Sequence, residues 1–287
     1  MKRGKRIMLW ILAGIALLIS GIVIWFILPY SPTKSEFTKL TAYQTKKMTT
    51  QNGIINTEDI SGLPLPVQRY FQYCGYLGTP KMLNMKVSYN DVDFVLSPDK
   101  PKLKIKYIQY NFVDEPERIA LIDTRMYGIP FEGIDAYQNG AGSMKGVIAK
   151  NFTLFNQKGE AMDKASLVTC LAESLLLPNL ALQDYISWEE IDDTHAKATI
   201  TYYGISASGI FTFDDNGTMK SFTTDDRENI DTNGNRQKVK WSAICGDYKE
   251  VNGIKYPTTL QAVWHFETGD LVYFDGKDVV IEYNVEK

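Results

Sequence analysis

The chain has 287 residues, 44% of them hydrophobic, and a net charge of −3, which excludes global disorder and allows a sizeable core. Residues 1–30 hold four basic and no acidic residues, which leaves 27 basic against 34 acidic residues, a net charge of −7, in 31–287. This acidic body argues against nucleic acid as a partner, because binding phosphates needs a positive surface. Two histidines and three cysteines leave little material for a metal site, and we expect no metal and no cofactor.

The N-terminal segment is typical of a membrane anchor. Residues 7–28 form an uncharged apolar run that is about 33 Å long as a helix, enough to cross a bilayer. The tail 1–6 is basic, so the positive-inside rule predicts a single-pass protein of the bacterial cell membrane, with a cytoplasmic N-terminus and residues 31–287 outside the cytoplasm. The alternative is a cleaved signal peptide, which normally has a shorter apolar region and a small-residue cleavage site.

A linker and a short helix follow the apolar run. Residues 29–62 are rich in Thr, Ser, Lys and Gln, so we interpret them as a stalk that leads into an extracytoplasmic domain over 63–287. Pro64 and Pro66 suit a helix start, and Gly75 suits its end. The apolar residues between them recur at helical spacing, which predicts a helix with one buried face.

Beyond this helix the apolar residues alternate with polar ones, which is the period of a β-strand. Such runs occur at 85–89, 102–107, 118–127, 142–155, 196–203, 207–213, 218–223, 238–245, 254–266 and 271–285. Asn216-Gly217, Asn252-Gly253 and Asp275-Gly276 supply the positive φ angles of tight hairpins. The pattern predicts an antiparallel meander of about ten strands that turns at these three positions.

One helix, predicted over 163–177, interrupts the strands, with Asp163 as its N-cap and Pro178 after its end. It has two apolar faces, one with Leu167, Leu171 and Leu175 and the other with Val168, Ala172 and Leu176. A helix that is apolar most of the way round is buried on two sides or covers a cavity. We therefore expect it to lie against the concave side of the sheet and to close an apolar space.

Several motifs follow one another along the domain: Leu63-Pro64-x-Pro66-Val67-x-Arg69-Tyr70, Asp135-x-Tyr137-x-x-Gly140-x-Gly142-x-Met144, Leu171-Ala172-Glu173 with Pro178, Trp188-x-x-Ile191-Asp192-Asp193, and Tyr248-x-Glu250-x-x-Gly253-Ile254-x-Tyr256-Pro257 with Trp264. Their order resembles a bacterial family known only as a domain of unknown function, over about residues 63–287. This resemblance implies no activity.

A second resemblance concerns the fold. The hairpin at 248–257 and the later strands that end at 281–285 are similar to the C-terminal hairpins of periplasmic lipoprotein carriers. That resemblance implies an incomplete antiparallel β-barrel, plugged by helices over an apolar cavity that accepts acyl chains. We therefore expect a mainly β (α+β) fold: one transmembrane helix, then an antiparallel meander that forms an incomplete barrel covered by one or two helices.

The sequence shows no recognisable catalytic constellation, and we do not predict an enzyme. It lacks a GxSxG elbow, and His195 follows Asp192-Asp193-Thr194 in a stretch that fits a solvated turn. His265 shares a strand face with Val263, where it is either a partly buried polar residue or a pocket donor. If the helix over 163–177 covers the barrel, Glu173 faces Arg118 or Arg125, and a solvent-facing Glu173 is the alternative.

Two functions remain open. The first is a membrane-anchored binding module for an apolar or amphiphilic ligand, such as a lipid or a lipidated partner. The second is an envelope protein–protein interaction or sensing domain with a filled core. For the first function the candidate ligand-binding residues are Tyr137, Leu171, Trp188, Trp241, Trp264, His265 and Tyr273. For each aromatic residue, a place in the core is the alternative reading.

Overall fold

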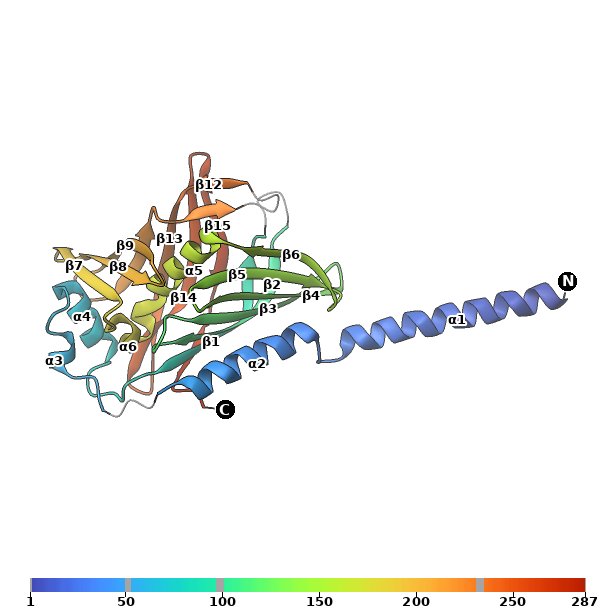
Figure 1. Ribbon diagram of the computed structural model, residues 1–287, viewed down its shortest axis with the longest axis horizontal. Coiled ribbons are helices and arrows are strands. Elements are labelled where there is room, and N and C mark those ends of the chain that lie inside the picture. The colour runs from blue at the N-terminus through green and yellow to red at the C-terminus, as the bar shows by residue number, and fades with distance from the viewer. Residues whose placement is uncertain (1, 50–52, 97–100, 231–234, 287) are drawn as a thin grey trace.

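The computed structural model describes residues 2–49, 53–96, 101–230 and 235–286 (Figure 1). A long helix, α1 (Lys2–Ile27), projects from a β-rich body. Among the described residues, it is the one helix that is long and apolar enough to cross a membrane, by length and composition only. A signal sequence near the N-terminus can also reach this length and composition, so the anchor stays a prediction.

Fourteen strands in the described part of the chain form one antiparallel sheet, in the order β6-β5-β4-β3-β2-β1-β15-β14-β13-β10-β9-β8-β7, with β16 paired to β1. The bounds are β1 (Asn84–Phe94), β2 (Leu103–Phe112), β3 (Arg118–Met126), β4 (Ile129–Gln138), β5 (Ala141–Ile148), β6 (Phe152–Lys158), β7 (Ile186–Asp192), β8 (His195–Tyr202), β9 (Ile205–Phe213), β10 (Met219–Thr224), β13 (Lys240–Val251), β14 (Ile254–Phe266), β15 (Gly269–Gly276) and β16 (Val280–Tyr283). A separate hairpin joins β11 (Glu228–Ile230) and β12 (Arg236–Lys238).

The sheet curves without closing, since β6 and β7 are its two edges among the described strands. This confirms the predicted mainly β fold with an incomplete antiparallel barrel. The strand count is higher than expected because the runs 142–155 and 271–285 each form two strands, and because β4 and β7 lack clear apolar alternation. Backbone pairing with β3 and β5 on its two sides defines β4, despite its proline and glycine.

Two of the three predicted hairpin turns are confirmed. Gly217 has a φ of +88° between β9 and β10, and Gly253 has a φ of +82° between β13 and β14. The third prediction is wrong, because Asp275 and Gly276 belong to β15 and pair with both β14 and β1. A Cβ atom on Gly276 would lie 2.6 Å from the ring of Tyr89. This glycine therefore allows close packing and makes no turn.

Within the described ranges, four further helices lie around the sheet: α2 (Pro32–Lys47), α3 (Thr57–Ile60), α4 (Leu65–Cys74) and α6 (Pro178–Ala181). Helix α4 is the one predicted at the start of the domain, and Gly75 ends it in a left-handed conformation, φ +74°. Helix α2 lies in the segment predicted as a stalk, and residues 50–52 of that segment are outside the described residues. Phe37 of α2 packs on Ile119, Leu121 and Ile134 of the sheet, so this part of the segment lies against the body.

The predicted helix over 163–177 is α5 (Glu160–Glu173), continued by a 3₁₀ turn, η1 (Ser174–Leu176). The prediction of Asp163 as its N-cap is wrong, because Gly159 occupies that position. Asp163 instead lies in the first turn, where its carboxylate accepts a hydrogen bond of 2.7 Å from the backbone N–H of Gly142. The side chain is therefore used to attach the helix to the start of β5.

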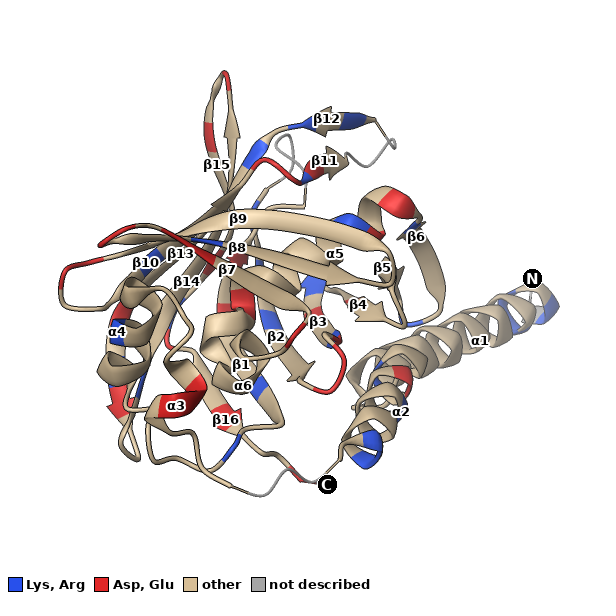
Figure 2. Cartoon of the chain, turned by 60° about the vertical axis from the view of Figure 1, so that its left-hand side comes forward, with Lys and Arg blue, Asp and Glu red and all other residues tan. Residues whose placement is uncertain are grey.

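Helix α5 lies inside the curved sheet, between β5 on one side and β8 and β9 on the other (Figure 2). The approach to β5 is close. A Cβ atom on Gly142 would collide with the carbonyl of Met162 and would lie 2.6 Å from Oγ of Ser166. Because Gly142 has no side chain, α5 can pack this closely on β5.

We predict that Gly142→Ala destabilises the protein by about 1–3 kcal/mol, because the added methyl group pushes α5 away from β5. The measurement is chemical denaturation of the full chain in detergent micelles. Gly246→Ala in β13 is the matched control, because its Cβ would meet only one atom, at 4.0 Å. Equal midpoints for the two variants would contradict the close contact.

Candidate ligand-binding cavity

A cavity of about 320 Å³ lies between α5 and the concave side of the sheet. Helix α5 contributes Met162, Ala165 and Ala172 to its wall, so the helix lies over an apolar space, as expected. Of the two predicted apolar faces, however, only Ala172 and Leu176 line this space, and the other members are buried in the core. Strands on the far side contribute large rings and aliphatic side chains. The main apolar residues of this wall are Met85, Val87, Tyr89, Phe94, Trp241, Leu260, Trp264, Leu271, Tyr273 and Phe274.

Three of the residues predicted as ligand-binding line this cavity: Trp241, Trp264 and Tyr273. The rings of Trp264 and Tyr273 stack with centroids 6.0 Å apart. The indole N–H of Trp241 donates a hydrogen bond of 3.1 Å to the hydroxyl of Tyr273. The three side chains therefore fix one another and form a rigid aromatic surface.

The other four predicted residues lie elsewhere. Tyr137 and Leu171 are completely buried in the hydrophobic core. Trp188 packs on Phe211 and donates a hydrogen bond from its indole N–H to the carbonyl of Ala181. His265 bonds to Ser242 at 2.9 Å and to Asp270 at 2.7 Å, whereas its neighbour Trp264 lines the cavity. Ligand contact by any of these residues stays a prediction.

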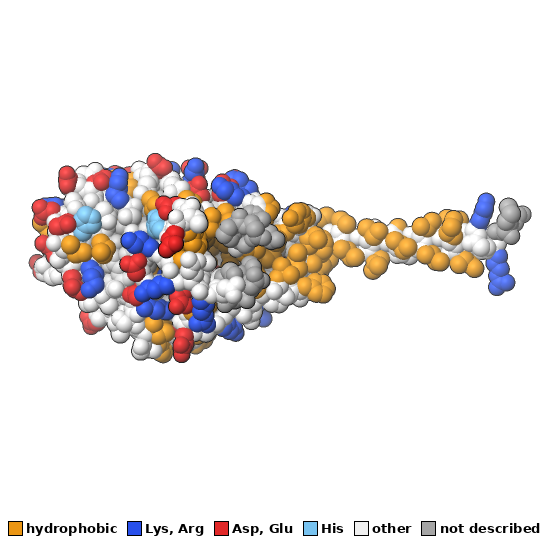
Figure 3. All heavy atoms as spheres, turned by 90° about the horizontal axis from the view of Figure 1, so that it is seen from above, with side chains coloured by type: hydrophobic (Ala, Val, Ile, Leu, Met, Phe, Trp, Pro, Cys, Tyr) orange, Lys and Arg blue, Asp and Glu red, His pale blue; other side chains and the backbone are white. Residues whose placement is uncertain are grey.

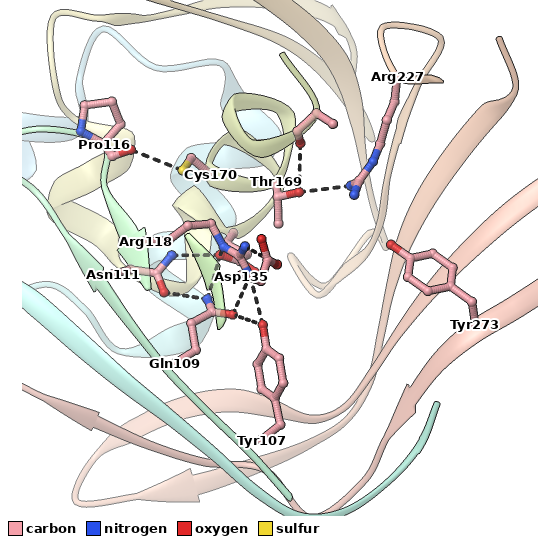
Figure 4. A network of polar contacts seen from close by, with 12 residues as sticks. Tyr107, Gln109, Asn111, Pro116, Arg118, Asp135, Thr169, Cys170, Arg227 and Tyr273 are labelled. Carbon is pink, nitrogen blue, oxygen red and sulfur yellow. Dashed lines mark hydrogen bonds and ion pairs between the residues drawn. The ribbon is translucent and has the colours of Figure 1, made fainter. Parts of the chain in front are cut away.

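A cation lies against the aromatic surface. The guanidinium of Arg227 is 4.5 Å from the ring centroid of Trp241 and 5.5 Å from that of Trp264, within cation–π range. Its Nη1 donates to Oγ1 of Thr169 on α5 at 2.9 Å (Figure 4). Its Nε is buried without a hydrogen-bond partner among the described residues. Arg227 thus keeps one unused donor in the cavity wall.

A second arginine anchors a polar cluster at another part of the wall (Figure 4). Arg118 is only 3% exposed. Its Nη1 donates to Asp135 at 2.7 Å, and its Nη2 donates to Tyr107 at 2.9 Å and to Gln109 at 2.8 Å. Burial alone would lower the pKa of Arg118, but the neighbouring charges of Asp135 and Glu173 raise it well above its usual value. The buried guanidinium is therefore charged and paired.

Glu173 connects this cluster to α5. Its Oε2 lies 3.4 Å from Nε of Arg118 and accepts hydrogen bonds from Gln109 at 2.8 Å and from Asn111 at 2.7 Å. The interpretation that Glu173 faces an arginine on a strand is confirmed, and that arginine is Arg118. Sequence reasoning missed Gln109 and Asn111. The available signal was that they continue the alternation of Ile105 and Tyr107, and so point inward.

Two of the cysteines are deeply buried, and one histidine is bonded to a neighbouring carboxylate. Burial raises the pKa of Cys74 and Cys245 to about 12, so both are unreactive thiols at neutral pH. The turn between β7 and β8 is formed by residues 193 and 194, as predicted for this stretch, and His195 begins β8 directly after it and bonds to Asp192 at 2.9 Å. Over the described ranges, no cluster of three or more His, Cys, Asp or Glu side chains is placed to hold a metal ion.

Comparison with known proteins identifies the family. A profile of the Family of unknown function (DUF6544) matches residues 53–276, most of the chain, so the chain belongs to this family, as the order of motifs predicts. A search of curated proteins gives no match. Among solved structures, the chain is similar to the crystal structure of a LolA superfamily protein from Nitrosomonas europaea, with a TM-score of 0.37 and 11% sequence identity, over 74% of this chain and 92% of that chain.

We predict that Glu173→Ala lowers the free energy of unfolding by about 1–3 kcal/mol, because it removes the acceptor of Gln109 and Asn111 and one of the two carboxylates that compensate the buried charge of Arg118. Urea denaturation of the full chain measures the effect. The control is Glu189→Ala, which removes a surface ion pair with Lys197 and should change stability by less than about 1 kcal/mol. Indistinguishable midpoints would mean that the cluster does not hold α5.

Proposed function

We propose that the chain is a membrane-anchored, extracytoplasmic binding module for an apolar or amphiphilic ligand, such as a lipid or a lipidated partner. The observation that carries this proposal is the cavity of about 320 Å³ beneath α5. Its volume is within the range of ligand pockets, which are mostly apolar with a few polar groups at fixed positions. A domain with a filled core would have no such space.

The apolar part of the ligand would lie along the aromatic surface. Burying apolar area is worth about 25 cal/mol per Å², so an acyl chain gains affinity in proportion to the length that enters. Small residues also belong to the wall: Ala172 on α5, and Ala243 and Ala262 on β13 and β14, two residues from Trp241 and Trp264. Larger side chains at these positions would fill the space that an acyl chain needs.

The two arginines differ in what they offer a polar headgroup. Nη1 and Nη2 of Arg118 are already bonded to Asp135, Tyr107 and Gln109. Its Nε also has no hydrogen-bond partner among the described residues, but it lies 3.4 Å from the carboxylate of Glu173. Arg227 is bonded to Thr169 and keeps a buried Nε without a partner in the described part of the chain. An acceptor on the ligand would remove the cost of that unpaired donor. This favours an amphiphile whose polar end meets Arg227.

The anchor supports the same function. Helix α1 is long and apolar enough to cross a bilayer, and the basic residues before it favour a cytoplasmic N-terminus. The domain would then be held close to a source of lipids. The second function, docking of an envelope protein, draws support from the two edges of the sheet, β6 and β7, which can add a strand from a partner.

The test is photo-cross-linking of the full chain, reconstituted in phosphatidylethanolamine and phosphatidylglycerol vesicles that contain palmitic acid with a diazirine group. We expect cross-links in the peptides of β14 and β15 that line the cavity, in addition to cross-links in α1. Ala262→Trp should remove the cross-links in β14 and β15, because the indole fills the cavity, and should keep the cross-links in α1. Val280→Trp, at an exposed position, is the control.

Cross-links confined to α1 in the wild-type chain would contradict ligand binding in the cavity. They would leave the docking of an envelope protein as the better account of the domain. Cross-links in β14 and β15 that persist in Ala262→Trp at the wild-type level would also contradict the proposal, because they would arise outside the cavity.

A further inference from the structure

An exposed apolar patch lies at the end of the body next to α1. It consists of Tyr127, Ile129, Phe152 and Leu154, which are 88%, 36%, 68% and 53% exposed, and we call it the tip patch. Its members come from the β3–β4 turn, the start of β4 and the start of β6. Figure 3 shows apolar side chains gathered where α1 meets the body. Clustered large apolar side chains on a surface indicate a contact.

The body is fixed to the end of α1 at this same place. Nζ of Lys150, in the β5–β6 turn, donates hydrogen bonds to the carbonyls of Trp25, Leu28 and Tyr30 at 2.7, 2.6 and 3.0 Å. Nη2 of Arg125, next to the β3–β4 turn, donates to the carbonyl of Phe26 at 3.2 Å. Carbonyls at the C-terminal end of a helix lack partners within the helix, and cations stabilise them.

The turn that presents Lys150 has an unfavourable backbone. Ala149 and Lys150 have φ angles of +52° and +67°, in a region where glycine and asparagine are preferred. Lys150 is nevertheless 3% exposed and pointed at the helix end. The strain is offset by three charge-assisted hydrogen bonds. The attachment holds the tip patch level with residues 25–30, where the uncharged run of α1 ends.

We infer that the tip patch contacts the outer surface of the lipid bilayer in which α1 is anchored, so that the domain has a fixed orientation on the membrane. This inference rests on the anchor in the proposed function. Tyr is enriched at the interface between lipid and water, and Phe is typical of the apolar face of segments that lie in this interface; Tyr127 and Phe152 are the two most exposed residues of the patch. Nη1 of Arg125 donates to the carbonyl of Gly128 in the β3–β4 turn at 3.0 Å, so the turn that carries Tyr127 also carries a cation that anionic headgroups would attract.

This contact would place the cavity close to the membrane. Strand β6 runs from Phe152 and Leu154 in the tip patch to Phe155 and Gln157 in the cavity wall. Three residues of extended chain span about 10 Å. The cavity wall therefore begins close to the lipid surface, along an edge strand of the sheet.

The test uses a fluorescent label on the full chain in phosphatidylethanolamine and phosphatidylglycerol vesicles that contain nitroxide-labelled phospholipid. A cysteine is introduced by Phe152→Cys and labelled with an environment-sensitive dye. The three native cysteines are at most 7% exposed, so the new cysteine reacts selectively. Tyr203→Cys is the control, because Tyr203 is 56% exposed and contacts Gly140 at the opposite end of β4.

We expect the label at position 152 to be quenched several-fold more than the label at 203, with emission shifted to shorter wavelength. Adding Tyr127→Asp should reduce the quenching at 152, whereas adding Ala262→Trp should leave it unchanged, which separates this contact from binding in the cavity. Equal quenching at 152 and 203, or failure of the full chain to float with the vesicles, would overturn the inference.

Discussion

The buried guanidinium of Arg118 is the constraint on which the rest of the structure depends. A charge that is 3% exposed is tolerated only when nearby groups compensate it. Asp135 on β4 and Glu173 on α5 provide the two carboxylates. The strand order therefore has to bring β4 beside β3, and α5 has to end over the same strands. One cation thus ties the helix to the inside of the sheet.

The cavity follows from how α5 is held. Glu173 fixes the C-terminal end of the helix, and Gly142 and Asp163 fix its N-terminal end against β5. Between these attachments the helix presents small side chains to the sheet, among them Ala165 and Ala172, and the facing wall is aromatic. Small residues opposite rigid rings leave a space that the polypeptide does not fill. The incomplete barrel therefore contains a cavity beneath the helix.

Much of this arrangement was predictable from the sequence, and the limits have physical causes. The two apolar faces of the helix over 163–177 predicted a covering helix, and for Glu173 in its middle an arginine partner was one of two interpretations, the other being exposure to solvent. Trp241, Trp264 and Tyr273 were identified by residue type, but so were Tyr137 and Trp188, which pack elsewhere. Residue type does not reveal which side chains of a strand point to the concave side of the sheet, because that depends on the register and curvature of the whole sheet. Strand β4 was missed because its neighbours, more than its own residues, define it.

The central claim is that the space beneath α5 holds an apolar molecule. The most direct measurement is lipid mass spectrometry on organic extracts of the purified full chain, compared between wild type and Ala262→Trp. Lipid around α1 contributes equally to both samples, so the difference reports the cavity. We expect the wild-type protein to carry an additional lipid at up to one molecule per chain, which the variant lacks. Identical lipid content in the two proteins would contradict the account.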